Sequence, residues 1–461
     1  MPSLLGTQAV VVGAGIGGLT AARVLADYFE RVVVVERDAL PESAEPRAGV
    51  PQGKHTHALL AGGQRALDDL FPGFEHDLIQ AGAVPLRVGL DVRIESPGYD
   101  PFPQRDLGWD AYAQSRARLE LSVRQRLHTC TNIALRQQCR VQACVARADG
   151  AAVIGVQCVL ADGKSATVEA DLVIDASGRG MLTLDLLKAV GWTLPEETTV
   201  GVDLAYATAI FRMPEVTPKD WKGVLCFPQP SQSTLGALLL PMEGKRWIVT
   251  VARMHGDALP DDVDGFMACV QQLRTPTIYN ALAHARPVSE IARFQFPASE
   301  YRHYERLEAF PRGLLPLGDA MCRFNPIYGQ GMSVAAQEAW ALRQLLAARA
   351  GAGDPLDGLA LAFFAEASAL IEAPWAMAAL PDFAHPDTRG ERPADLEQRL
   401  KVGHAMNQLA ARDPAVHKLM AEVQHLLKPQ SVYQDPELTQ RLQAILAEAG
   451  DNTGSHRGPE A

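Results

Sequence analysis

A glycine-rich turn between two short apolar runs, within residues 8–36, constrains the fold of this chain more than any other feature. Residues 9–12 are apolar and lead into the turn Gly13-Ala-Gly-Ile-Gly-Gly18. A helical pattern follows, and a β-branched run at residues 32–35 ends at Glu36. This order of strand, glycine turn, helix, strand and acid is typical of a dinucleotide-binding βαβ unit. The sequence therefore predicts an α/β domain with a parallel sheet.

Each glycine of the turn has a physical reason to be there. Gly13 permits the tight turn, Gly15 lets the backbone approach a diphosphate without a Cβ in the way, and Gly18 lets the helix pack closely on the strand. The helix N-terminus would present free N–H groups and about half a positive charge to the diphosphate. Glu36 is placed to accept hydrogen bonds from a ribose diol. An ordinary glycine turn is the plainer alternative, but it does not require an acid in this register.

Length, charge and cysteine usage limit the class of protein. The 461 residues are enough for two or three domains with a large core. A formal net charge of −11 without a basic stripe argues against nucleic acid as a partner. Seven scattered cysteines form no CxxC pair, which fits a reducing compartment and argues against a metal-finger or disulfide framework. We expect a cytoplasmic protein.

Two apolar stretches could be mistaken for membrane or targeting segments. Residues 1–7 lack a basic region, and the run that follows is interrupted by the glycine turn. Residues 359–380 contain Glu366, Glu372 and Pro374, and they fall short of the ~18 uninterrupted apolar residues that a span needs. We expect a soluble amphipathic helix there and no membrane span.

Hydrophobic periodicity and turn residues predict the remaining elements. Helices are expected at residues 58–71, 115–127 (with Ser115 as N-cap), 264–273 and 330–350, and several more over 356–446. Strands are expected at residues 140–148, 153–160, 167–175, 201–213, 223–227, 235–240, 247–252 and 289–296. The strand-rich middle looks like an antiparallel sheet inserted into the α/β domain.

The expected fold class is therefore α/β: a Rossmann-type domain with an inserted antiparallel β-sheet substrate domain and a C-terminal helical region. The Rossmann-type domain would be assembled from residues 1–80, 111–185 and 301–350. A substrate-side insertion at 81–110, the substrate domain at 186–300, the helical region at 351–450 and a disordered tail at 451–461 complete the expected division.

Three further segments carry motifs. The loop 47–57 reads RAGVPQGKHTH, residues 170–180 read ADLVIDASGRG, and residues 317–332 read LGDAMCRFNPIYGQGM. Together with the glycine turn they resemble the FAD-dependent monooxygenases of the aromatic-hydroxylase and squalene-epoxidase type, above all the bacterial flavin epoxidases and hydroxylases of natural-product pathways. The resemblance extends from about residue 8 to 446. No second GxGxxG is present, so one dinucleotide is expected in a dedicated domain.

The resemblance implies that this dinucleotide is FAD. Asp319, directly after Gly318, takes the place of the family aspartate that hydrogen-bonds the ribityl chain. Pro326 would shape the wall where oxygen reacts. The start of the next helix would direct backbone N–H groups at the flavin N1/C2 edge, the candidates being Gly329, Gln330, Gly331 and Met332. Reduced flavin carries negative charge on that edge, and a helix N-terminus stabilises it.

Other candidate cofactor contacts lie in the loops. Arg47 and Arg116 match family arginines that contact the cofactor, and Arg37 follows the ribose-binding Glu36. The turn at 175–180 would close over the adenosine and diphosphate, with Asp175 and Gly178 as its candidates.

Plainer roles are open for several of these residues. Asp319 could be a helix N-cap, Asp175 a turn former and Arg47 a solvated loop charge. His55 and His57 alternate as metal ligands sometimes do, but no Cys, Asp or Glu lies at ligand spacing, so a structural or flavin-packing role is expected and no metal site. The strand aromatics are core candidates, some of which would line a substrate pocket: Tyr206, Phe211, Trp247, Phe294 and Phe296.

The expected reaction is monooxygenation of an apolar small molecule bound between the sheet domain and the flavin. NAD(P)H or a separate flavin reductase would supply electrons, and a flavin C4a-hydroperoxide would transfer its distal oxygen. The absence of a convincing base in the sequence favours alkene epoxidation over aromatic hydroxylation. Three alternatives stay open: a flavin halogenase, whose WxWxIP motif is absent, a double-bond reductase of the geranylgeranyl-reductase type, and a non-catalytic FAD-binding protein.

Overall fold

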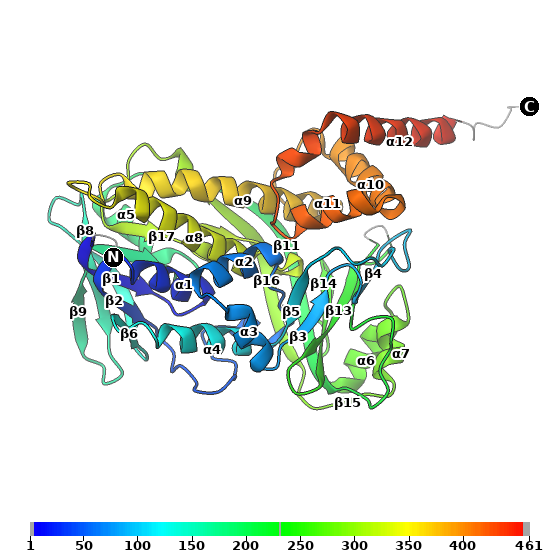
Figure 1. Ribbon diagram of the computed structural model, residues 1–461, viewed down its shortest axis with the longest axis horizontal. Helices are drawn as coiled ribbons and strands as arrows, with labels where there is room; N and C mark the ends of the chain where they lie inside the picture. The colour runs from blue at the N-terminus through cyan, green and yellow to red at the C-terminus, as the bar shows by residue number, and fades with distance from the viewer. Residues whose placement is uncertain (1–3, 230–231, 455–461) are drawn as a thin grey trace, which may run out of the picture.

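The computed structural model describes residues 4–229 and 232–454. Two large sheets organise it: a five-stranded parallel sheet near the N-terminus and an eight-stranded, mostly antiparallel sheet in the middle of the chain (Figure 1). Helices from the C-terminal region lie across the top of both (Figure 1). The predicted α/β class with an inserted antiparallel sheet is confirmed.

The parallel sheet has the strand order β17-β10-β1-β2-β6. Its strands are β1 (Gly6–Val12), β2 (Phe29–Val35), β6 (Ile133–Arg136), β10 (Leu172–Asp175) and β17 (Leu314–Pro316). The valines that end β1 and β2 are buried on both faces, as expected for parallel strands covered on each side. The predicted glycine turn thus leaves the carboxyl end of the central strand, where ligands of open α/β sheets bind.

Different layers cover the two faces of this sheet. On one face Val11 packs with helices α1 (Ile16–Leu25), α4 (Arg116–Leu127) and α8 (Gly331–Arg349). On the other face Val10 and Val12 pack on a three-stranded sheet and on α5 (Met181–Val190). The small sheet consists of β7 (Arg140–Ala146), β8 (Val153–Val159) and β9 (Ser165–Glu169).

The prediction of one strand at residues 167–175 is wrong. Residues up to Glu169 belong to β9 and pair with β8, whereas β10 starts at Leu172 and pairs with β1. The chain changes sheets between them, where the backbone N–H of Asp171 bonds the carbonyl of Gln8. Hydrophobic periodicity does not report such a change, because both strands alternate with the same period of two.

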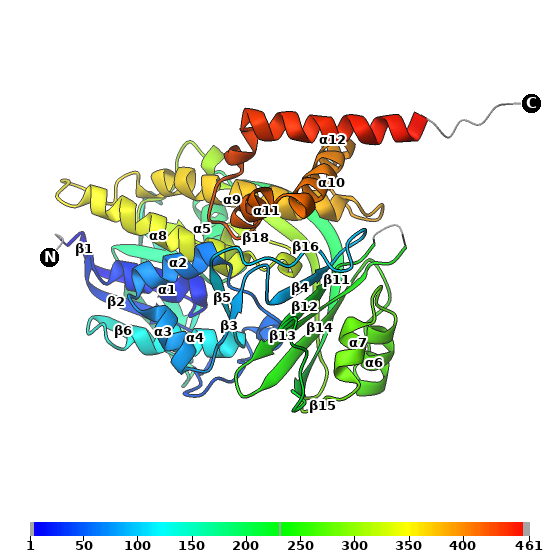
Figure 2. The same ribbon diagram turned by 45° about the vertical axis from the view of Figure 1, so that its right-hand side comes forward.

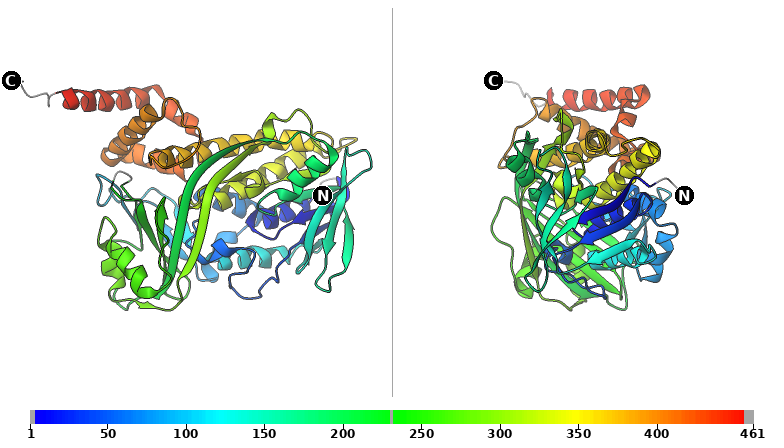
Figure 3. Two further views of the ribbon diagram at one scale, coloured as in Figure 1. Left: turned by 180° about the vertical axis from the view of Figure 1, so that it is seen from behind. Right: turned by 90° about the vertical axis from the view of Figure 1, so that its left-hand side faces the viewer.

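The eight-stranded sheet has the order β18-β16-β11-β14-β13-β12-β4, with β15 paired to β11. Its strands are β4 (Val92–Glu95), β11 (Glu196–Arg212), β12 (Gly223–Cys226), β13 (Leu235–Met242), β14 (Arg246–Met254), β15 (Arg286–Pro287), β16 (Ala292–His303) and β18 (Cys322–Arg323). The long strands β11 and β16 curve from the parallel-sheet side into the rest of the sheet (Figure 3).

Alternation along β11 gives this sheet two different faces. Ala207, Ala209 and Phe211 pack with α6 (Val263–Gln271) and α7 (Thr277–Leu282) on the outer face (Figure 2). Tyr206 and Thr208 point to the opposite face, toward the loop 51–60 and the C-terminal helices. The inner face of the sheet is therefore the face on the side where the cofactor is expected.

Residues 81–110 join the sheet domain in part. Strand β4 adds to its edge in parallel with β12, while β3 (Val84–Arg87) pairs with β5 (Asp110–Ala113) as a separate two-stranded sheet. Helices α2 (Ala61–Leu70) and α3 (Phe74–Gln80) lead into this segment. Four elements cross the expected domain limits: β5 starts at residue 110, α5 extends beyond residue 185, β16 beyond residue 300 and α12 beyond residue 450.

The C-terminal region forms helices α9 (Leu359–Phe383), α10 (Leu396–Arg412), α11 (Pro414–Gln424) and α12 (Pro436–Gly454). By length and composition α9 could cross a membrane. However, its residues Phe363, Phe364, Ala367 and Ile371 are buried in the same core as α8, so α9 packs as a core helix. Of the tail expected to be disordered, residues 455–461 lie outside the described residues, and α12 includes the part before them.

Candidate active site

The glycine turn after β1 leaves open space at one of its glycines. A Cβ on Gly13, whose φ is +103°, would lie 2.5 Å from the carbonyl oxygen of Ala176, and a Cβ on Gly18 would overlap the carbonyl oxygen of Gly13. A Cβ on Gly15 would meet nothing closer than Nη2 of Arg116, at 3.9 Å. Gly15 is the N-cap of α1 and provides no side-chain cap, so first-turn N–H groups are free for an anion.

Glu36 and Arg47 belong to one buried ion cluster beside this turn. Oε2 of Glu36 accepts a hydrogen bond from the backbone N–H of Ala14 at 2.8 Å. Arg47 lies 2.9 Å from Glu36, 3.0 Å from Asp38 and 2.8 Å from Glu120, measured between charged atoms. Burial lowers the pKa of Arg47, but Glu120 and Glu36 outweigh it, and the net shift is upward. The guanidinium of Arg47 thus fixes the loop 47–57 against β2 and α4 while adjoining the expected ribose position.

Asp319 and Arg116 lie close enough together for each to affect the pKa of the other. Asp319 has a large exposed fraction, yet desolvation by the surrounding protein raises the pKa of its carboxyl. Burial also lowers the pKa of Arg116, against the opposing effects of Glu120 and Asp319. Nε of Arg116 has no hydrogen-bond partner among the described residues. A Cβ on Gly331 would lie 3.7 Å from Oδ1 of Asp319, so the start of α8 lies at the same place.

The turn after β10 is built differently from the expectation. The carboxylate of Asp175 is fully buried and accepts hydrogen bonds from the backbone N–H and hydroxyl groups of Ser177 and Thr183. It therefore holds its own turn and the start of α5. Gly178, with φ +95° and open space around its Cα, lies on the outside of that turn. The Asp175 side chain is therefore engaged within its own turn.

The segment 325–332 forms the short helix η4 (Pro326–Tyr328) and then the start of α8. Asn325 caps η4 by accepting the N–H of Ile327 at 3.1 Å, and Gly329 reverses the chain with φ +68°. Gln330, the N-cap of α8, gives no side-chain cap, so this helix N-terminus also has N–H groups free for a ligand.

These features fit FAD. Several features that a bound dinucleotide requires lie near one another. They are the open space at Gly15, two helix N-termini without side-chain caps, an arginine with an unpartnered Nε and the Asp319 carboxylate. A protein-family model described as "FAD binding domain" matches residues 6–356. The chain belongs to this FAD-binding family. The resemblance to FAD-dependent monooxygenases is thereby confirmed, and with it the expected enzyme class, an FAD-dependent oxidoreductase.

This FAD-binding protein is also similar to several individual proteins. Protein Rv3254 of Mycobacterium tuberculosis is 36% identical over 405 residues, which cover 84% of each chain. The flavin-dependent brominase Bmp2 has a TM-score of 0.68 at 12% identity, over 97% of this chain and 100% of its own. PqsL of Pseudomonas aeruginosa, solved with 2-aminobenzoylacetate, has a TM-score of 0.63 at 17% identity, over 83% and 97%. At these identities the two structures show a shared fold.

The residues predicted to contact FAD differ in how close they lie to Asp319 and Arg116. The structure brings together Gly15, Arg116, Asp319 and Gly331, whereas Arg37 is exposed and donates to the carbonyl of Gly49 at 3.2 Å. The other candidates lie on the turns just described or next to them: Gly13, Gly18, Glu36, Arg47, Asp175, Gly178, Gly318, Pro326, Gly329, Gln330 and Met332.

The loop with the two histidines connects the FAD-binding domain to the sheet. A chain of hydrogen bonds begins at Nδ1 of His55, which lies 2.7 Å from the Thr208 hydroxyl. The Thr208 hydroxyl lies 2.7 Å from the Thr250 hydroxyl, and the Thr250 hydroxyl lies 2.8 Å from the Thr56 hydroxyl. The His55 ring lies 5.6 Å from the Tyr206 and Phe294 rings. Sequence patterns could not reveal this network, because its hydrogen-bonded partners are as much as 194 residues apart.

Glu338, in the interior of α8, is a site residue that sequence reasoning missed. It is fully buried, and its Oε2 accepts the backbone N–H of Gly318 at 2.6 Å. Burial raises the pKa of Glu338 to about 8, against the effect of the Gly318 N–H, and Asp319 adds to the increase. Glu338 therefore supports the Gly318–Asp319 corner from behind. A polar residue on a long helix gives no signal of such a role.

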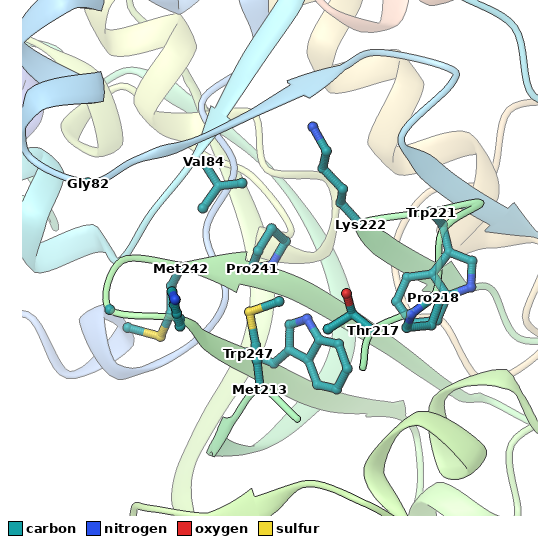
Figure 4. A pocket seen from close by; sticks show the side chains of 12 residues that line it. Gly82, Val84, Met213, Thr217, Pro218, Trp221, Lys222, Pro241, Met242 and Trp247 are labelled. Carbon is teal, nitrogen blue, oxygen red and sulfur yellow. The ribbon is translucent and has the colours of Figure 1, made fainter. Parts of the chain in front are cut away.

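A separate cavity of about 380 Å³ lies at the far end of the sheet domain. Its walls are Val84 of β3, the hairpin between β13 and β14 and the loop before β12, with the aromatic rings of Trp221 and Trp247 (Figure 4). None of the predicted cofactor contacts lines it, whereas Trp247, one of the strand aromatics considered for a substrate pocket, does. The expected FAD site and this cavity therefore lie at different places in the molecule.

Proposed function

We propose that the chain is an FAD-dependent monooxygenase that inserts one oxygen atom from O2 into an apolar small molecule, by alkene epoxidation or aromatic hydroxylation. The observation that best supports it is the aromatic inner face of the sheet beside the flavin turn. Tyr206 and Phe296 form a buried cluster against which Phe294 and Ile327 of η4 pack. A substrate held between that face and the flavin would lie at a domain junction, where pockets are common.

The residues of this chain have distinct tasks in such a reaction. Reduced FAD, when bound, would supply the activation of O2. Gly15 and Arg116 would bind the diphosphate. Gly15 leaves space for it, and Arg116 has an Nε without a hydrogen-bond partner among the described residues. The buried aromatic cluster would hold the substrate and exclude water, which protects an oxygenated species from decay.

His55 lies beside the aromatic inner face of the sheet, next to Tyr206 and Phe294. Burial lowers the pKa of His55 to about 4, with Lys54 contributing, so its imidazole is neutral at neutral pH. Thr208 holds Nδ1, while Nε2 is buried without a partner among the described residues. A phenol hydroxylation gains from a group that accepts the hydroxyl proton, whereas an epoxidation does not need one. Both reactions therefore stay in the proposal.

The proposal also covers the electron donor and the cellular location. One GxGxxG unit is present, so electrons would come from NAD(P)H bound outside a second Rossmann domain or from a separate flavin reductase. We further propose a cytoplasmic enzyme, in line with the scattered cysteines. A place in secondary metabolism is proposed from the resemblance to the flavin epoxidases and hydroxylases of natural-product pathways.

Isotope incorporation tests the proposal. The holoprotein is reduced with NADPH or with a flavin reductase, and candidate alkenes and phenols are then supplied with labelled O2 and bromide. A product that gains one labelled oxygen atom supports monooxygenation. A brominated product would instead identify a halogenase, and a saturated product formed without O2 a double-bond reductase. Reduced flavin that returns all labelled oxygen as peroxide or water with every substrate would refute the proposal.

A further inference from the structure

The C-terminal helix α9 places a buried carboxylate against the flavin turn. Asp382, in the last turn of α9, is 1% exposed. Its carboxylate accepts two hydrogen bonds from Nδ2 of Asn325, at 3.0 and 3.1 Å, and one from the hydroxyl of Tyr328, at 2.9 Å. The match to the FAD-binding family ends at residue 356, before α9 begins. The family pattern therefore does not account for Asp382.

Both partners of Asp382 belong to the turn that leads into α8. Asn325 uses its Oδ1 to cap η4 and its Nδ2 to bond Asp382, so one side chain connects the carboxylate to the turn backbone. Tyr328 directly precedes Gly329, the residue with positive φ that begins the approach to α8. The carboxylate thus holds both ends of η4.

The end of α9 is itself anchored to the sheet domain. The hydroxyl of Thr388 donates to the carbonyl of Asp382 at 2.7 Å. Arg392 donates to four backbone carbonyls that follow the helix, at residues 383, 385, 386 and 388. Arg389 exchanges two backbone hydrogen bonds with Gly201 of β11, at 2.8 and 3.1 Å. Asp382 therefore connects the sheet, the C-terminal helices and the flavin turn.

The stability of the folded protein alone does not explain a carboxylate at position 382. No basic side chain among the described residues lies within salt-bridge distance of Asp382. A buried carboxylate without a cation is costly, and an apolar replacement is often at least as stable. Burial raises the pKa of Asp382 to about 6, although the hydrogen bonds from Asn325 and Tyr328 oppose the increase.

We infer that Asp382 is a positioning residue for the cofactor: through Asn325 and Tyr328 it fixes the turn that would present Gly329, Gln330 and Gly331 to the flavin. The inference rests on the FAD-binding role of that turn and goes beyond it, because it assigns part of the cofactor site to the C-terminal region. It also predicts that the charge of Asp382 affects bound flavin, since reduced flavin carries negative charge.

The variant D382N tests this, with D387N as matched control. Asn keeps the size of Asp382 but loses its charge, whereas Asp387 is exposed and lies five positions further along the same segment. Three properties are measured: thermal unfolding of each apoprotein, the dissociation constant for FAD, and the visible spectrum and midpoint potential of bound flavin. For D382N we expect unfolding near the wild-type temperature, FAD binding about tenfold weaker, an altered flavin band and a more positive potential. D387N should match the wild type.

The variant Y328F covers the case in which D382N does not fold. It removes one O–H donor and leaves the Asn325 bonds, so FAD binding about threefold weaker and a smaller spectral change are expected. The inference is overturned if D382N, or Y328F in its place, matches D387N in FAD affinity, spectrum and potential. Failure of the wild type itself to bind FAD would instead overturn the cofactor assignment.

Discussion

At the scale of single residues, Gly15 and Gly18 show how a side chain can be excluded for two different reasons. At Gly18 the neighbouring backbone fills the space, so the glycine is required by the fold. At Gly15 the space is open up to Arg116, so the fold itself does not require a glycine there, whereas a bound cofactor would.

This difference makes a prediction for a matched pair of alanine variants. The apoprotein of G15A should unfold within about 1 kcal/mol of the wild type, because its Cβ meets no close atom. G18A should lose about 1–3 kcal/mol or more, because its methyl group overlaps the Gly13 carbonyl. Both variants should lose FAD affinity. Urea unfolding of the apoproteins and an FAD titration check this, and a G15A protein with wild-type FAD affinity would contradict it.

A second prediction concerns Glu338 and pH. Because its pKa is raised from 4.5 to about 8, the folded protein holds a proton on Glu338 that the unfolded chain releases earlier. This contribution to stability is complete below the unfolded pKa and is lost as the pH rises toward 8. The variant E338Q is always neutral, so its stability relative to the wild type should increase over this range by up to a few kcal/mol.

Urea unfolding of the two apoproteins at about pH 5 and about pH 8.5 measures this difference. Glu308 is exposed, and E308Q serves as control with no such trend. A constant difference between E338Q and the wild type across these pH values would show that Glu338 titrates as in the unfolded chain.

Site residues could be predicted from the sequence where they belong to a local motif, and not where their contacts are distant in sequence. The glycine turn, Glu36 and Asp319 belong to contiguous motifs, so they could be named from the sequence. Asp382 lies in the last turn of α9 and Glu338 in the interior of α8, and they act on segments 57 and 20 residues away, so no local pattern marks them. Arg47 was predicted as a cofactor contact from its motif, but the three carboxylates that surround it, on α4 and in the segment after β2, could not be predicted from that motif.

At the scale of elements, the loop 47–57 depends on Arg47. Its side chain is 7% exposed and lies between three carboxylates. Removing the cation leaves these carboxylates close together and buried. A buried pair that loses one partner typically costs about 3–5 kcal/mol.

We therefore predict that R47M loses roughly 3–5 kcal/mol of unfolding free energy. R37M, ten positions earlier, should change it by less than about 0.5 kcal/mol, because Arg37 is exposed. Chemical denaturation of both variants measures the difference. Equal losses for R47M and R37M would show that the buried cluster does not hold the loop.

Element boundaries were predictable where caps or turns mark them, as for α4 with Ser115 accepting the N–H of Arg118. Assignment of strands to sheets was not, as β9 and β10 show, because β9 pairs with its neighbour β8 whereas β10 pairs with β1 across more than 160 residues. The docking of the loop 51–60 on Thr208 and Thr250 belongs to the same class of long-range contact.

At the scale of the whole molecule, three regions of the chain meet at the expected flavin. The parallel-sheet domain provides the glycine turn and the Asp319 corner, the inserted sheet provides the aromatic face, and α9 holds η4. FAD should therefore act as a ligand of the folded state and raise the unfolding temperature in proportion to its occupancy.

The most direct test of this account is titration of the apoprotein with FAD, followed by flavin absorbance and fluorescence, with circular dichroism to verify that the protein is folded. The account predicts saturable binding of one FAD per chain, a yellow protein and a higher unfolding temperature. A folded protein that stays colourless and shows no thermal shift at saturating FAD would contradict it.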